Sequence, residues 1–229
     1  MKIYHGSKNI ISEPKVKGSN PTNDYGPCFY VTKDYENACV WACKQNSVGF
    51  VNEYKVDLRG LKVLDLTDKE KYSVLNWIAI LVKFREFEHP FEKLNHTRIQ
   101  KLIEKYYINI EEYDYIIGYR ADDAYFRFPK EFISGNISIE DLEEVFRLGS
   151  LGVQYAFVSE KAIKRIHFTE AKQTSDKYVG MYYSQVLEAT SLFDEILFKS
   201  INSNKGTRIG DVLKWFFFLL IMWANIVMF

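Results

Sequence analysis

The order in which strand-like and helix-like segments follow one another constrains the fold of this chain most. Strands are predicted where β-branched and aromatic residues cluster between turn-forming residues, and helices where apolar residues recur at helical spacing. The predicted strands span residues 2–4, 29–32, 50–57, 61–66, 113–119, 154–158 and 165–168. The predicted helices span residues 33–44, 72–87, 95–106, 129–133, 139–148 and 182–198, and Thr32 is expected to cap the first of them. A turn is expected at residues 5–7. The strands at 50–57 and 61–66 are expected to pair, and so are those at 154–158 and 165–168. Because strands often follow one another directly, the pattern predicts an α+β fold and not a regular βαβ alternation.

The composition of the chain changes after Thr169, and this change suggests three parts. Residues 1–169 carry all the predicted strands and a helical insert near residues 70–108. Residues 170–209 are polar and form a helical extension. Residues 210–229 are dominated by an apolar run.

The apolar C-terminal run, Trp215 to Phe229, contains no charged residue. It is shorter than the roughly 20 residues that a spanning helix needs. The preceding Lys214 and the two tryptophans of the run suit a membrane interface. Three interpretations stay open: membrane contact through residues 213–229, a buried helix, or a partner-binding segment. The first residues turn polar at once and do not resemble a signal peptide, so we expect a cytoplasmic protein, attached to a membrane only if this C-terminal segment anchors it.

Charge and cysteine content narrow the function classes. The 30 basic and 30 acidic residues cancel, so no global positive field points to nucleic-acid binding, although nucleic acid as a substrate stays open. Cys28, Cys39 and Cys43 form no Cys-x-x-Cys pair and have no histidine nearby. We therefore expect no metal site, and reduced thiols in the cytoplasm.

A first candidate for ligand binding is Tyr4-His5-Gly6-Ser7. A histidine that leaves a strand can point its ring into a cleft and donate a hydrogen bond from Nε2 to a ribose hydroxyl. The following glycine lets a ligand approach the backbone closely, where its amide group can bind a carboxamide. The alternative is a surface histidine beside a turn.

Two further candidates lie later in the chain. Tyr30 lies on the predicted strand 29–32 and Trp41 lies on the next helix, so the two rings could hold a planar cationic ring between them. The alternative is that Trp41 only packs its helix against a sheet. Gln154 opens a late strand after a glycine-flanked loop, and its amide can donate and accept hydrogen bonds but cannot act as a base. The alternative interpretation is that Gln154 is an ordinary residue of an edge strand.

These three features, in this order, resemble the His-Tyr-acid branch of the ADP-ribosyltransferases. In that branch the histidine holds the ribose of NAD, the next glycine pairs with the nicotinamide amide, two tyrosines enclose the nicotinamide, and a late glutamate polarises the ribose 2′-hydroxyl. The resemblance assigns NAD binding to His5, Gly6, Ser7, Tyr30 and Trp41, and places Gln154 at the position of the glutamate.

Residues 1–168 also resemble a bacterial domain-of-unknown-function family regarded as ADP-ribosyltransferase-like. The shared features are the start Lys2-Ile3-Tyr4-His5-Gly6-Ser7, the Phe-Tyr-x-Thr stretch and the block from Ile116 to Phe126, which reads IIGYRADDAYF. The resemblance implies two small mixed or antiparallel sheets with an NAD cleft between them. It also implies the toxin of a toxin–antitoxin pair, with a small antitoxin protein as partner.

Departures from the family pattern affect the chemistry that we expect. Cys28 replaces a glycine, Trp41 replaces the second tyrosine, and Gln154 replaces the acid that stabilises the developing oxocarbenium ion. We expect Asp122 or Asp123 to supply the missing carboxylate and Arg120 to bind the pyrophosphate. The alternative is a solvated turn with a surface ion pair.

The sequence therefore predicts an NAD-dependent ADP-ribosyltransferase, with NAD as substrate and a protein or nucleic acid as acceptor. The alternatives are an NAD glycohydrolase on the same fold and a non-catalytic module that binds NAD or ADP-ribose. Nucleotide-binding glycine loops and the hydrolase nucleophile motif are not found in the sequence.

Overall fold

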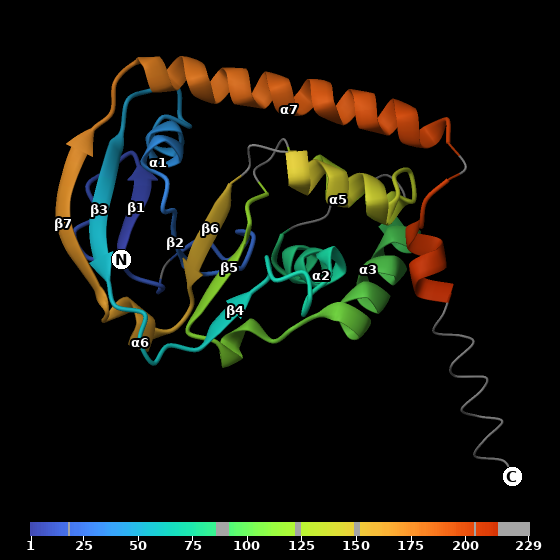
Figure 1. Ribbon diagram of the computed structural model, residues 1–229, viewed down its shortest axis with the longest axis horizontal. Coiled ribbons are helices and arrows are strands. Elements are labelled where there is room, and N and C mark those ends of the chain that lie inside the picture. The colour runs from blue at the N-terminus through green and yellow to red at the C-terminus, as the bar shows by residue number, and fades with distance from the viewer. Residues whose placement is uncertain (18, 86–91, 122–124, 149–151, 204, 215–229) are drawn as a thin grey trace, which may run out of the picture.

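The computed structural model of the protein describes residues 1–17, 19–85, 92–121, 125–148, 152–203 and 205–214. Its strands form two small sheets (Figure 1). The first sheet contains β1 (Lys2–Ser7), β3 (Phe50–Val56) and β7 (Ile166–Gln173), in that order and all antiparallel. The second has the order β2 (Phe29–Val31), β6 (Val153–Phe157), β5 (Tyr115–Tyr119) and β4 (Val63–Asp65), and only β4 and β5 are parallel. The prediction of an α+β fold with two small sheets is confirmed.

The two sheets are joined at one point between β1 and β2. The backbone N–H of Tyr4 donates to the carbonyl of Thr32 at 2.8 Å, and the N–H of Thr32 donates to the carbonyl of Tyr4 at 2.9 Å. Beyond this bridge β1 continues to Ser7 in the first sheet, while β2 pairs with β6 in the second. The two strands therefore diverge beyond this bridge (Figure 1).

Helices cover the outer sides of both sheets. They are α1 (Tyr35–Ala42), α2 (Val74–Phe84), α3 (Glu92–Tyr106), the short 3-10 helix η1 (Ile110–Glu112), α4 (Arg127–Ser134), α5 (Ile139–Leu148), α6 (Glu160–Ile163) and α7 (Lys177–Ile201). Helix α1 packs on β1, α2 packs on α3, and the long α7 contacts α1 and α4. In Figure 1, α7 therefore runs along one side of the molecule from the first sheet to the helices beside the second.

The largest core lies between the second sheet and the helices α2 to α5. Helix α2 carries apolar residues on nearly every face, from Leu75 to Val82, and all of them are buried. A helix with this pattern must be enclosed on all sides. It begins at Ser73, whose N–H donates to Asn76 Oδ1 at 2.9 Å in a capping box.

Three local predictions are wrong. Residues 5–7, expected to form a turn, continue β1, because each of them has a partner in β3. The strands at 50–57 and 61–66 do not pair with each other, and neither do those at 154–158 and 165–168, because each member joins a different sheet. Asp34, and not Thr32, caps α1, since its carboxylate accepts from the Asn37 N–H at 2.9 Å.

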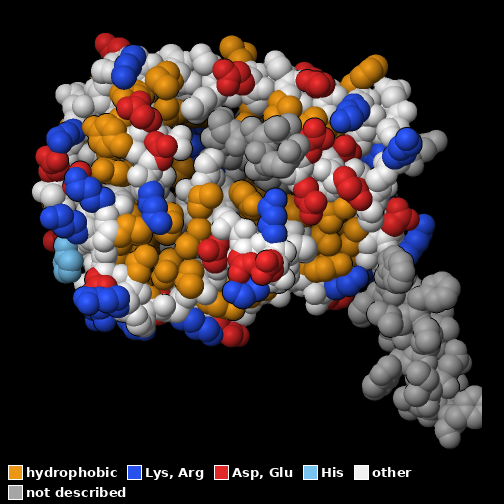
Figure 2. All heavy atoms as spheres, viewed as in Figure 1, with side chains coloured by type: hydrophobic (Ala, Val, Ile, Leu, Met, Phe, Trp, Pro, Cys, Tyr) orange, Lys and Arg blue, Asp and Glu red, His pale blue; other side chains and the backbone are white. Residues whose placement is uncertain are grey.

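The surface in Figure 2 mixes basic and acidic side chains without a large field of one sign. This distribution agrees with the zero formal charge of the sequence. Within the part of the chain that the structure describes, no helix has the length and apolar character needed to cross a bilayer. The apolar run 215–229 lies outside that part.

Candidate functional site

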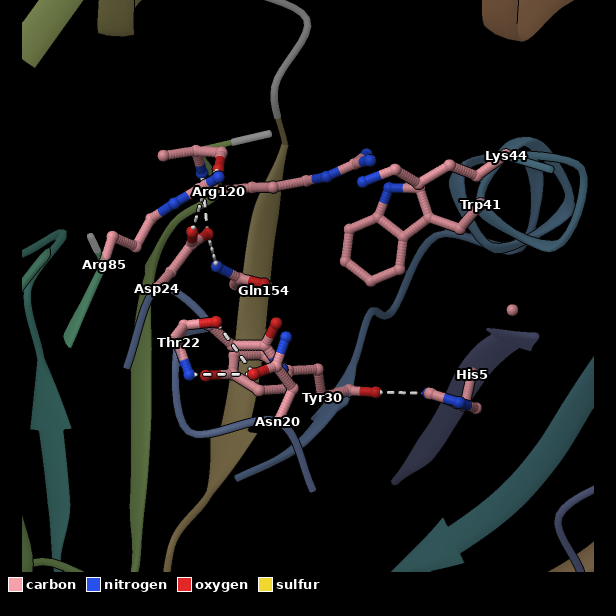
Figure 3. Close-up of a pocket in the computed structure, with 13 residues that line it drawn as sticks. His5, Asn20, Thr22, Asp24, Tyr30, Trp41, Lys44, Arg85, Arg120 and Gln154 are labelled. Carbon is pink, nitrogen blue, oxygen red and sulfur yellow. Dashed lines mark hydrogen bonds and ion pairs between the residues drawn. The ribbon is translucent and has the colours of Figure 1, made fainter. Parts of the chain in front are cut away.

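A pocket of about 530 Å³ opens where the two sheets diverge (Figure 3). Residues from both sheets, from α1 and from four connecting segments line it: His5, Gly6, Asn20, Thr22, Asn23, Asp24, Tyr30, Trp41, Lys44, Arg85, Arg120, Ala121 and Gln154. Among these described residues there are three cationic side chains and one carboxylate. The charge of the lining therefore favours an anionic ligand.

The ring of His5 lies at the β1 side of the pocket, and its protonation state follows from its contacts. Nδ1 lies 2.7 Å from the backbone carbonyl oxygen of Tyr30, which can only accept a hydrogen bond. Burial lowers the pKa of His5 below its usual value, although this hydrogen bond acts in the opposite direction. At neutral pH His5 is thus a neutral imidazole with its proton on Nδ1. Its Nε2 is an acceptor, and not the donor that one would assign from the residue type alone.

Gly6 follows His5, and because it has no side chain both α1 and a ligand in the pocket can come close to its backbone. A Cβ built on Gly6 would lie 2.0 Å from the carbonyl oxygen of Ala38, so only glycine lets α1 pack against β1 here. The amide groups of residues two apart in a strand point to the same edge. Those of Gly6 therefore point to the edge where Tyr4 bonds Thr32, and the described strands give them no backbone partner. Gly6 exposes one N–H and one C=O to the pocket.

Ser7, predicted to bind NAD, does not line the pocket. Its hydroxyl donates to the carbonyl of Asn9 and accepts from Asn52 Nδ2 at 3.1 Å. The structure therefore gives Ser7 a role in the turn that follows β1.

Tyr30 and Trp41 both line the pocket, as predicted, but in different ways. The Tyr30 hydroxyl is used within the protein, since it donates to the Gly26 carbonyl at 2.7 Å and accepts from the Tyr25 N–H at 3.0 Å. Only the Tyr30 ring remains for a ligand. The face of the Trp41 ring is covered by the guanidinium of Arg120, 4.0 Å from the ring centre. The buried Trp41 Nε1 has no hydrogen-bond partner among the described residues.

Gln154 lies at the back of the pocket and is almost completely buried. Its Nε2 donates to Asp24 Oδ2 at 2.9 Å and to the carbonyl of Tyr119 at 3.2 Å. Both amide hydrogens are thus used. Figure 3 shows the amide oxygen on the side of Gln154 that faces away from Asp24.

Asp24 is the carboxylate that the described lining contributes, and it comes from the loop before β2. Besides Gln154, it accepts from Arg85 Nη1 at 3.0 Å and from the Ala121 N–H at 2.8 Å. Burial raises the pKa of Asp24 above its usual value, although all three donors favour the ionised carboxylate. Arg85 also donates to the Ala121 carbonyl, so Asp24 and Arg85 together fix the chain that follows β5.

Comparison with known protein families gives a match, which covers residues 1–168. The family is described as "Protein of unknown function (DUF3990)". The chain belongs to this family. Neither the curated proteins nor the solved structures contain a match to the chain. All residues that line the pocket fall within the DUF3990 domain.

Arg120 and Ala121 line the pocket, and they belong to the block from Ile116 to Phe126 on which the resemblance to this family rests. Gly118 leaves room for Tyr25, since a Cβ there would lie 2.1 Å from the tyrosine hydroxyl. That hydroxyl donates to the Tyr119 carbonyl at 2.7 Å and accepts from Trp77 Nε1 at 3.0 Å. This arrangement aligns the end of β5 with Gln154.

Two of the predicted site residues, Asp122 and Asp123, lie outside the described residues. Sequence reasoning missed Asp24 and Arg85. Asp24 lies in a loop rich in glycine, proline and asparagine, and nothing in that loop distinguishes a buried aspartate from a turn-forming one.

The three cysteines are buried and are not linked by disulfides. Cys28 donates to the Tyr25 carbonyl at 3.1 Å, and burial raises its pKa to about 12. It therefore stabilises the loop beside the pocket as a protonated thiol. In the described part of the chain, no group of three or more acidic, histidine or cysteine side chains could hold a metal ion.

Proposed function

We propose that the DUF3990 domain binds NAD in this pocket and transfers its ADP-ribose to a macromolecular acceptor. The observation that supports this proposal is the meeting of His5, Gly6, Tyr30, Trp41, Arg120 and Gln154 in one pocket. The resemblance to ADP-ribosyltransferases assigns roles to five of these residues, and the sequence separately predicts that Arg120 binds the pyrophosphate. They come from five separate stretches of the chain, so their convergence is unexpected for an unrelated pocket.

The geometry supports a specific role for each side chain. His5 Nε2 accepts a hydrogen bond from a ribose hydroxyl, and the N–H and C=O of Gly6 pair with the nicotinamide carboxamide. The rings of Tyr30 and Trp41 contact the nicotinamide. Arg120 moves off Trp41 to bind the pyrophosphate, for which guanidinium is well suited.

The reaction breaks the bond between the ribose C1′ and the nicotinamide nitrogen. Its electron pair stays on nicotinamide, which leaves neutral, and positive charge develops at C1′. A nucleophilic atom of the acceptor then bonds C1′ from the opposite face and loses its proton to water. The products are nicotinamide and an ADP-ribosylated protein or nucleic acid.

The biological setting that we propose is that of a toxin neutralised by a small antitoxin protein in the bacterial cytoplasm. Residues 213–229 would add a membrane contact. Fractionation of the full chain and of residues 1–214 between membranes and cytosol tests that contact. The shorter chain should keep Val212 and Leu213, because both are buried.

Purified protein incubated with NAD tests the activity. We expect release of nicotinamide, and transfer of label from labelled NAD to macromolecules of a lysate. His5→Ala should lower the release at least tenfold, whereas His167→Ala, on an exposed face of β7, should not change it. No release and no NAD binding by the unmodified protein would refute the proposal.

A non-catalytic NAD-binding module is a second candidate, and the position of Gln154 favours it. An amide lacks the negative charge that the glutamate of the ADP-ribosyltransferases brings to the ribose. Such a module would bind NAD without releasing nicotinamide. A glycohydrolase would release nicotinamide but transfer no label.

A further inference from the structure

We propose that Asp24 is a positioning residue that restores the missing carboxylate of this site by acting through Gln154. Asp24 orients the amide so that its oxygen faces the ligand, and it places a negative charge one hydrogen bond behind that amide. This inference rests on the proposed function and deepens it. It replaces the expectation that the acid comes from the segment after β5.

The orientation of the Gln154 amide follows from its partners. The carboxylate of Asp24 and the carbonyl of Tyr119 can only accept hydrogen bonds, so both require the NH₂ group of Gln154. The amide oxygen is left as an acceptor on the other side (Figure 3). Gln154 therefore presents to the pocket the same kind of atom that a glutamate would present.

The position of Asp24 is itself fixed from three sides. Arg85 Nη1, the Ala121 N–H and Gln154 Nε2 lie between 2.8 and 3.0 Å from its oxygens. These donors come from the ends of α2 and β5 and from β6, so the carboxylate cannot turn away without losing bonds to all three. A carboxylate held in this way keeps its negative charge directed at the Gln154 amide.

This arrangement fits the chemistry of the proposed reaction. The Gln154 oxygen accepts a hydrogen bond from the ribose 2′-hydroxyl. The negative charge on Asp24 increases the electron density on that oxygen and stabilises the positive charge that develops at C1′. No proton passes to Asp24, and the bonds that form and break are those of the reaction already described.

Exchanging the positions of the carboxylate and the amide tests the inference. Asp24→Asn alone removes the negative charge and leaves the Tyr119 carbonyl as the acceptor that still requires the NH₂ group of Gln154, so the amide is held less firmly. We expect kcat for nicotinamide release to fall at least tenfold, with KM for NAD within about threefold. In the double variant Asp24→Asn/Gln154→Glu, an amide donates to a carboxylate that faces the ligand, and we expect at least half of the lost activity to return.

Gln154→Glu alone gives a readout that a merely structural role would not produce. Two carboxylates would then lie about 3 Å apart and share one proton, as in coupled acid pairs. We expect activity at acidic pH that is lost as the pH rises and the shared proton leaves. A pH profile identical to that of the unmodified protein would overturn the inference.

Asp114→Asn is the matched control. Asp114 is as buried as Asp24 and accepts from Ser159 and Lys161, but it does not line the pocket. Its replacement should lower the melting temperature and leave kcat unchanged.

The outcomes separate this inference from the proposed function. If the unmodified protein releases no nicotinamide, the proposed function fails, and the inference with it. If that protein is active and Asp24→Asn keeps its kcat, or the double variant recovers nothing, only the role of Asp24 is refuted. If Asp24→Asn does not fold, the double variant and the pH profile of Gln154→Glu still decide.

Discussion

At the scale of single residues, the hydrogen-bond partners decide what the pocket can do. The carbonyl of Tyr30 makes Nε2 of His5 an acceptor, and the acceptors around Gln154 turn its oxygen toward the ligand. Both conclusions depend on which atoms are neighbours. The residue types alone leave them open.

The lowered pKa of His5 predicts a defined pH dependence. NAD affinity should stay constant as the pH falls to 6.5, the ordinary value for histidine, and decrease only below it, when Nε2 gains a proton and stops accepting. In the same range the unfolded chain binds a proton that the folded protein does not. The free energy of unfolding should therefore also decrease as the pH falls below 6.5.

Isothermal titration calorimetry with NAD across this pH range checks the affinity. His5→Asn provides the comparison, because its amide does not titrate and any remaining affinity should be independent of pH. An affinity for the unmodified protein that is already falling well above pH 6.5 would contradict a buried neutral imidazole.

The residues that sequence reasoning found and missed differ in one respect. His5, Tyr30 and Gln154 lie within or directly beside predicted strands, where the alternation of side chains indicates which ones leave a sheet. Asp24 lies in a loop, and its donors Arg85 and Gln154 lie 61 and 130 residues further along the chain. No local pattern encodes such contacts.

At the scale of elements, the contact between β1 and α1 determines the shape of the pocket. The sequence predicts both elements, since alternation and helical spacing are local signals. It does not predict that residues 5–7 continue β1, because a glycine after a histidine favours a turn unless a partner strand is present. That partner, β3, begins at Phe50.

Two glycine substitutions should change stability in opposite directions. Gly6→Ala places a methyl group 2.0 Å from the Ala38 carbonyl, and we expect it to lower the free energy of unfolding by at least about 1–3 kcal/mol. Gly180→Ala lies on α7 with no atom within 4 Å of the new methyl group, and it should raise that free energy by up to about 1 kcal/mol.

Urea denaturation of the two variants beside the unmodified protein measures both effects. A Gly6→Ala protein of undiminished stability would show that α1 can move away from β1 without cost.

At the scale of the whole molecule, α7 connects parts that belong to different layers. Tyr178, near its start, is buried against α1, and Phe193, further along, packs on Phe128 of α4 with ring centres 5.1 Å apart. The sequence predicts a helix here but places it in a polar extension, because most of its residues are exposed. Its buried residues Ala189, Phe193 and Ile196 recur at helical spacing. Apolar residues that are exposed, such as Leu187 and Phe198, hide this stripe in the sequence.

Phe193→Ala should lower the free energy of unfolding by about 3–5 kcal/mol if α7 unfolds together with the domain. Phe198→Ala, whose side chain is 74% exposed, should change it by less than about 0.5 kcal/mol. Thermal unfolding followed by circular dichroism distinguishes the two. Equal melting temperatures would mean that α7 is not part of the cooperative unit.

For the proposed NAD site, the guanidinium of Arg120 on the ring of Trp41 predicts a preference for one redox state of the nucleotide. A ligand that takes the place of Arg120 on this ring removes one cation–π contact. The oxidised nicotinamide ring carries a positive charge and replaces that contact, whereas the dihydronicotinamide of NADH is neutral and does not. A contact of this kind contributes about 0.5–2 kcal/mol, so NAD should bind between about twofold and thirtyfold more tightly than NADH.

Competition titrations of both nucleotides, repeated with Trp41→Leu, measure this preference, which should disappear in the variant. The site would then respond to the supply of oxidised nucleotide in the cell and would ignore most of the reduced pool.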